Sequence, residues 1–66
     1  MQQKNRKVRQ VLVAAQVHKE LTELKKLGIR VPKKAFEVAT REAAEFVANG
    51  MSVSEIADLC INRAQV

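Results

Sequence analysis

The sequence predicts an all-α domain of three helices with a long first helix, assembled as a dimer. Three observations predict it. Residues 4 to 27 contain no Pro or Gly and are rich in strong helix formers. Apolar residues recur at helical spacing over residues 33 to 49, and Ser52-Val53-Ser54-Glu55 is a capping box that opens a last helix. Residues 1 to 66 make a single domain, and a chain of this length buries little surface alone.

The first helix, predicted over residues 4 to 27 and closed by Gly28, carries two apolar sides. One side is expected to face the core and comprises Val13, Val17, Leu21 and Leu24. The other side is the predicted dimer interface and comprises Val8, Val11, Leu12 and Ala15. Three short helices have too little mass to cover both sides of the first helix. A second copy of the chain is therefore expected to cover the side that contains Val8 and Ala15. A short strand over residues 11 to 13 is the alternative, because two of these residues are β-branched.

The second and third helices follow Pro32, which suits the start of a helix. The stripe of residues 33 to 49 comprises Ala35, Phe36, Ala39, Ala43, Phe46 and Val47. Both Phe residues are therefore expected in the core, and Gly50 is expected to end this helix. The third helix is predicted to bury a stripe comprising Val53, Ile56, Leu59 and Cys60.

Basic residues gather in the first half of the chain. Residues 1 to 34 contain ten Lys and Arg against two acidic residues, whereas residues 35 to 66 contain two against five. Such a one-sided distribution favours a polyanion, and DNA is the predicted partner. The first candidate cluster is a basic N-terminal arm over residues 1 to 9 that comprises Lys4, Arg6, Lys7 and Arg9. The second cluster lies at the first turn between helices and comprises Lys25, Lys26, Arg30, Lys33 and Lys34.

Residue counts argue against several other classes of protein. One Cys cannot form an intrachain disulfide, and one Cys with one His cannot build a four-ligand zinc site. His18 has no nucleophile beside it and is expected to be a solvated helix residue, so we expect no enzyme, no metal and no cofactor. The longest apolar run, Val11 to Ala15, is too short to cross a bilayer. A cytoplasmic protein with no membrane partner is expected.

Residues 49 to 59, with the sequence Asn-Gly-Met-Ser-Val-Ser-Glu-Ile-Ala-Asp-Leu, resemble two families of small phage- or plasmid-type DNA-binding regulators. In helix-turn-helix proteins a similar segment opens the helix that precedes the recognition helix. Residues 61 to 66 are too few to form a turn and a recognition helix after it. The ribbon-helix-helix family resembles residues 26 to 66 more fully. That resemblance implies an alternative fold with a short strand at 26 to 31, with Leu27, Ile29 and Val31 inward and Lys26, Gly28 and Arg30 toward the major groove.

These observations together predict a small basic transcriptional regulator that binds DNA as a dimer. The alternative is a helical protein-binding module that inhibits or modulates an acidic host protein through its Val8 to Ala15 side. RNA is a third option, disfavoured because the chain has no Trp or Tyr on which bases could stack.

Overall fold

The computed structural model describes residues 2 to 65 of the chain, and the side chains of residues 7 to 65. The fold contains four helices, so the all-α prediction is confirmed and the count of three helices is wrong. The helices are α1 (Gln2–Lys26), α2 (Lys33–Arg41), α3 (Ala43–Ala48) and α4 (Val53–Ala64).

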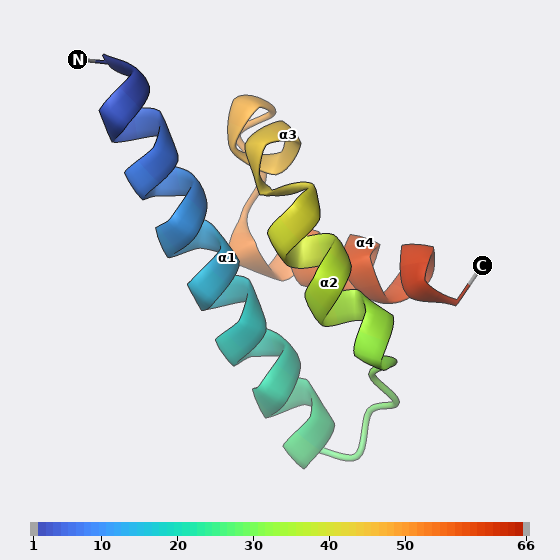
Figure 1. Ribbon diagram of the computed structural model, residues 1–66. Helices are drawn as coiled ribbons and strands as arrows, with labels where there is room; N and C mark the ends of the chain where they lie inside the picture. Colours follow the sequence, from blue (N-terminus) through green and yellow to red (C-terminus); the bar gives the residue numbers. More distant parts are fainter. Residues whose placement is uncertain (1, 66) are drawn as a thin grey trace.

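The additional helix arises from a bend at Glu42 within the segment predicted as one helix. Glu42 has φ −105° and ψ 14°, outside the helical region. Its N–H still donates to the Val38 carbonyl at 2.9 Å, and its own carbonyl accepts from the Phe46 N–H at 3.2 Å. The chain therefore changes direction with no intervening loop, and α3 packs beside the N-terminal half of α1 (Figure 1).

Two glycines end helices as predicted. Gly28 and Gly50 have φ of 91° and 64°, the left-handed region that a residue without Cβ adopts freely. At the end of α1, the Ile29 N–H donates to Leu24 O at 3.0 Å and the Gly28 N–H to Lys25 O at 3.1 Å. This pattern is a Schellman motif, and α3 ends at Gly50 in the same way.

No strand occurs among residues 2 to 65, so both alternative strand predictions are wrong. Residues 11 to 13 lie within α1, where the apolar neighbours Val17 and Leu21 continue the helical pattern. Residues 27 and 28 form the turn of the Schellman motif, and residues 29 to 32 form a connection without regular secondary structure.

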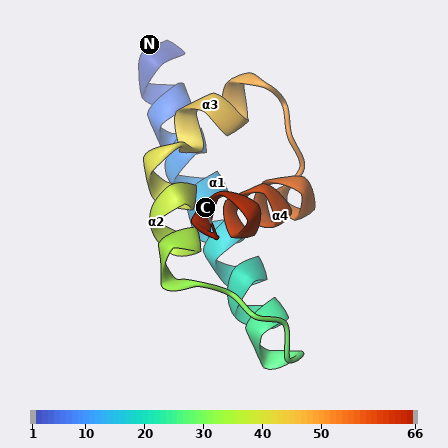
Figure 2. The same cartoon turned by 90° about the vertical axis from the view of Figure 1, so that its right-hand side faces the viewer.

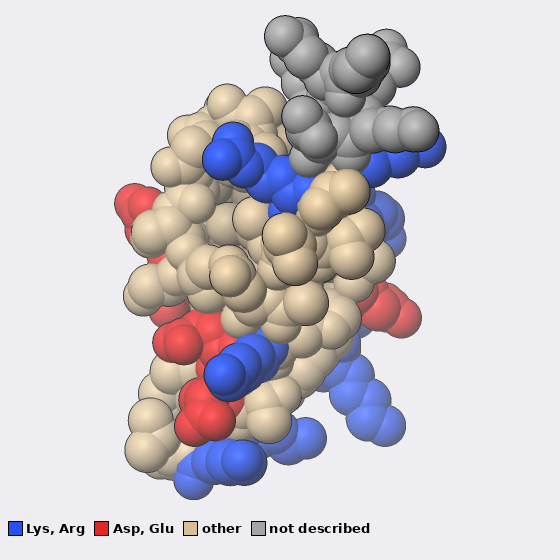
Figure 3. Space-filling view, turned by 90° about the vertical axis from the view of Figure 1, so that its left-hand side faces the viewer, with Lys and Arg blue, Asp and Glu red and all other residues tan. Residues whose placement is uncertain are grey.

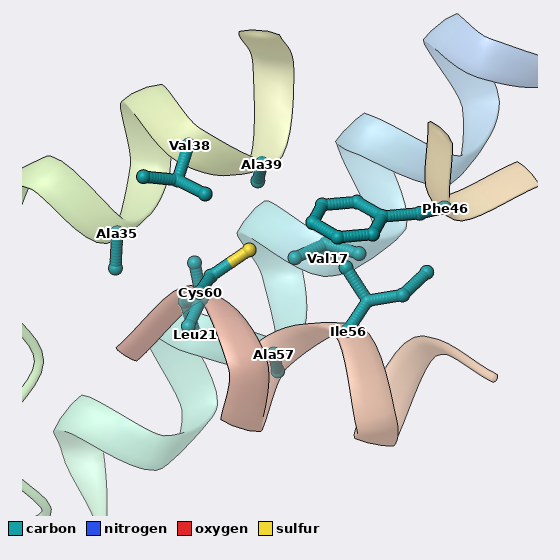
Figure 4. Close-up of a cluster of buried hydrophobic side chains, with 9 residues drawn as sticks. All are labelled: Val17, Leu21, Ala35, Val38, Ala39, Phe46, Ile56, Ala57 and Cys60. Atoms are coloured by element: carbon teal, nitrogen blue, oxygen red, sulfur yellow. The ribbon is translucent and has the colours of Figure 1, made fainter. Parts of the chain in front are cut away.

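The helices pack around one core. α2 and α3 run back along α1, and α4 crosses behind them and contacts both α1 and α2 (Figures 1 and 2). Val17 and Leu21 of α1 are fully buried, and Val13 and Leu24 pack against the same core, so the predicted core face is confirmed. Figure 4 shows the remaining core side chains, which are Ala35, Val38, Ala39, Phe46, Ile56, Ala57 and Cys60.

The capping box at the start of α4 is confirmed. The Glu55 N–H donates to Ser52 Oγ at 3.2 Å, and the Ser52 N–H donates to Glu55 Oε1 at 3.0 Å. α4 carries Cys60 into the core, where burial raises the pKa of its thiol to about 11. The thiol is therefore protonated at neutral pH and packs as a small apolar side chain.

Candidate nucleic-acid interface

The N-terminal basic cluster is partly described. The side chains of Lys4 and Arg6 lie outside the described residues, whereas Lys7 and Arg9 are exposed on α1. The Arg9 side chain borders a hollow between α1 and α3 that is also lined by Gln10, Ala44, Val47 and Ala48.

The second basic cluster lies at the other end of α1. Lys25 and Lys26 end this helix, Arg30 lies in the connection, and Lys33 and Lys34 open α2. All five side chains are exposed. At 1.5 Å of rise per residue, Arg9 and Lys25 are separated by about 24 Å along the helix axis. The structure therefore separates the two clusters and does not bring them into one patch.

Figure 3 shows this separation on the face that α1 presents. Basic side chains lie near the upper end and in the lower part of this face, with mostly uncharged residues between them. Acidic side chains lie at both edges and also beside a basic side chain in the lower part. A polyanion that contacted both clusters would have to extend along α1. A DNA duplex is long enough to do so, because one helical turn of it spans about 34 Å.

The candidate cations whose side chains are described form no ion pair with a described carboxylate. Among residues 7 to 65, the ion pairs are those of Arg63 with Glu42 and with Glu45, the latter at 3.8 Å. The Arg63 guanidinium also lies over the Phe46 ring, 5.7 Å from its centroid. The described candidate cations thus have no carboxylate side chain within bonding distance, so phosphate oxygens could reach them without displacing an internal partner.

Two of these cations occupy a position that does not favour helix stability. Lys33 and Lys34 are the first two residues of α2, which has no acidic residue in its first turn and no side-chain cap. The N-terminal end of a helix carries partial positive charge and favours anions. The backbone and both side chains at this end of α2 therefore present positive charge outward.

The predicted dimer side of α1 is exposed in the single chain. Val8, Val11 and Leu12 are exposed over 57%, 68% and 57% of their surface, and Ala15 is also exposed. Their spacing of three and four residues places them on one side of the helix, away from Val17 and the core. The structure thus leaves an apolar strip on the outside of the N-terminal half of α1.

His18 was expected to be solvated, and this expectation is wrong. The ring is half-buried between α1 and α2, with Nε2 2.9 Å from Phe36 O and 3.0 Å from Thr40 Oγ1. Because a carbonyl can only accept, Nε2 carries the proton in the contact with Phe36. The ring also meets the Phe36 ring edge-on, with the centroids 5.3 Å apart. His18 therefore ties α1 to α2.

Leu27 and Ile29 do not face inward, as the ribbon-helix-helix alternative implied. They are 77% and 46% exposed, and of this alternating set only Val31 packs against the core. One feature of the sequence does place Leu27 outside the core. A residue directly before the terminating glycine of a helix lies at the helix cap, beyond the last turn that the core covers.

The described residues meet neither the requirements of a metal site nor those of a membrane-spanning helix. No three His, Cys, Asp or Glu side chains among them come together in a way that could hold a metal ion. No helix in the described part of the chain has the length and apolar character needed to span a membrane.

The fold and the site together define an all-helical basic domain with two separate exposed cation clusters and an exposed apolar strip. Comparison of the chain with protein-family models, with curated proteins and with solved structures finds no match.

Proposed function

We propose that this protein is a small DNA-binding regulator that acts as a dimer. Its two basic clusters would contact the phosphates of a duplex, and the apolar strip Val8 to Ala15 would pair two copies. The observation that carries the proposal is the set of seven described candidate cations, all exposed and none paired with a described carboxylate side chain. Lys and Arg in this state release counterions from DNA on binding, which is the main source of affinity in sequence-independent contacts.

The salt dependence of binding tests the proposal directly. The measurement is fluorescence anisotropy of a labelled random-sequence duplex, titrated with the protein at several salt concentrations. Each phosphate contact contributes about −0.9 to the slope of log Kobs against log salt, so four contacts give about −3.6. A slope flatter than about −2, or no binding near physiological salt, would contradict DNA binding.

A matched pair of single variants tests the location of the site. Lys25→Gln removes one charge from the second cluster, and Arg41→Gln removes one exposed charge at the end of α2, outside both clusters. The first variant is expected to weaken binding several-fold and to flatten the slope by about one, the value for one lost contact. The second is expected to keep the slope. Equal losses in both would mean that net charge, and no particular surface, attracts DNA.

The apolar strip also suits the second candidate function, a helical module that binds an acidic protein. Exposed aliphatic residues at helical spacing are the anchors that a partner groove receives. Sedimentation of the isolated protein beside the DNA titration separates the two functions. A monomer that does not bind duplex favours the protein partner.

A further inference from the structure

The connection between α1 and α2 exposes one aliphatic side chain among cations. Leu27 is 77% exposed, the largest exposed fraction among the large apolar residues of the described chain. Residues 24 to 36 around it contain no acidic residue, and their five basic side chains are those of the second cluster. The most exposed large apolar side chain of the described residues thus lies within the second basic cluster.

Local structure explains the neighbours of Leu27 but leaves Leu27 without packing partners. The Schellman motif brings Ile29 toward Leu24 through the bond from Ile29 N–H to Leu24 O, and a hydrophobic contact between these two positions commonly accompanies it. Val31 packs against the core. Leu27 precedes Gly28 at the very end of α1 and is not part of the core or of the residues packed against it.

The charges around Leu27 indicate which kind of partner its side chain contacts. Lys25, Lys26 and Arg30 are within three residues of it, and three residues of chain extend at most about 10 Å. Cations at this range would hold the phosphates of a duplex against the connection. An apolar side chain held so close to a duplex can leave water by entering the base stack, and Leu is among the residues that do so from the minor groove.

We propose that Leu27 is an apolar wedge that inserts between base pairs in the minor groove and kinks the bound duplex. The proposal rests on the proposed DNA binding and adds its mode. A bilayer surface also presents phosphates, but binding at such a surface uses a wide apolar helix face of Trp, Phe or Leu side chains. Near the second cluster the exposed large apolar side chains are those of Leu27 and Ile29, and both lie outside the helices. This chain has no Trp, and Phe36 and Phe46 both belong to the packed interior.

The experiment compares the wild-type protein with Leu27→Ser, Leu27→Met and Ile29→Ser. Energy transfer between dyes at the two ends of a short duplex reports the kink, and anisotropy reports affinity at several salt concentrations. Leu27→Ser is expected to abolish the increase in energy transfer and to weaken binding about tenfold, as loss of one buried Leu implies. Its salt slope is expected to change by less than one contact, because the phosphate contacts remain.

The other variants separate a wedge from general apolarity. Leu27→Met is expected to keep the kink, since Met also serves as a wedge. Ile29→Ser is expected to keep it as well, because Ile29 is only 46% exposed and Leu27 is 77% exposed. Circular dichroism melting of each variant shows whether it is folded, and an exposed side chain such as Leu27 is expected to leave the melting midpoint unchanged.

Each contrary result points to a different error. An equal kink with Leu27→Ser overturns the wedge and leaves DNA binding intact, whereas no binding of duplex by the wild-type protein overturns both. A further arm uses vesicles of phosphatidylcholine and phosphatidylglycerol in equal parts. Vesicle binding that is lost in Leu27→Ser, without binding to duplex, overturns the wedge and assigns Leu27 to a lipid surface.

Discussion

At the scale of single residues, the capping box at the start of α4 links sequence, stability and pH. The Ser52 N–H and hydroxyl both donate to the Glu55 carboxylate, each at 3.0 Å. These two hydrogen bonds, of which the backbone one has the larger effect, lower the pKa of Glu55 from its ordinary value of 4.5. Because the folded pKa is the lower one, the bonds stabilise the fold above pH 4.5 and lose their effect as the pH falls through the folded value.

Ser52→Ala removes the side-chain half of the box. We expect the free energy of unfolding to fall by about 1 kcal/mol at neutral pH, as for other lost N-caps. We also expect a shallower loss of stability on acidification, because the Glu55 carboxylate keeps only its backbone donor. Urea unfolding followed by circular dichroism at several pH values between neutral and acid measures both effects. Glu55→Gln is the control, since it keeps an acceptor at this position but does not titrate there; an acid dependence equal to that of the wild-type protein would contradict the argument.

At the scale of elements, α2 carries its charges in an order that opposes the helix dipole at its N-terminal end. Lys33 and Lys34 lie in its first turn, and Arg41 lies in its last turn, where a cation is favourable. The unfavourable pair belongs to the proposed DNA surface. The positive charges of Lys33 and Lys34 are therefore expected to favour DNA binding and to lower the stability of α2.

The substitution Lys34→Glu is expected to raise stability and to weaken DNA binding. It replaces a repelled charge by an attracted one at the helix N-terminus, so the free energy of unfolding is expected to rise by about 0.5 to 1 kcal/mol. Duplex binding, measured by anisotropy, is expected to weaken. Arg41→Glu makes the same change of charge at the opposite end of α2 and is expected to destabilise the protein. Destabilisation by Lys34→Glu would show that another interaction outweighs the dipole.

At the scale of the whole molecule, α1 is longer than the core that the other helices build against it. The domain measures 41 × 22 × 17 Å, with Val17 and Leu21 buried on one side of α1 and Val8, Val11 and Leu12 exposed. α2 to α4 lie against the former side alone (Figures 1 and 2). The outer strip therefore needs a partner outside this chain to be covered, and a second copy of α1 offers the same strip.

Leu12→Ser tests whether a second copy covers the strip. A twofold interface loses the side chain twice, and each loss is worth about 1.5 to 3 kcal/mol, so the dimer dissociation constant is expected to rise at least about hundredfold. Sedimentation equilibrium over a range of concentrations measures it. Leu27→Ser, an equal change at the far end of α1, is the control and is expected to leave association unchanged. A wild-type protein that is monomeric at every concentration would refute the dimer.

Several features of this protein were decided by the sequence alone, because they depend on neighbours within a few residues. Gly28, Gly50 and the Ser52–Glu55 box set helix ends through hydrogen bonds that span three to five residues. The buried side of α1 at Val17 and Leu21 followed from helical spacing. The exposure of the seven described cations of the two basic clusters likewise followed from the high cost of burying unpaired charge.

Only the tertiary structure decided the features that join distant parts of the chain. The bend at Glu42 is held by Arg63 from α4, and His18 meets Phe36 O across 18 residues. Spacing along the sequence does not encode such contacts, because they form only when several helices pack on one another.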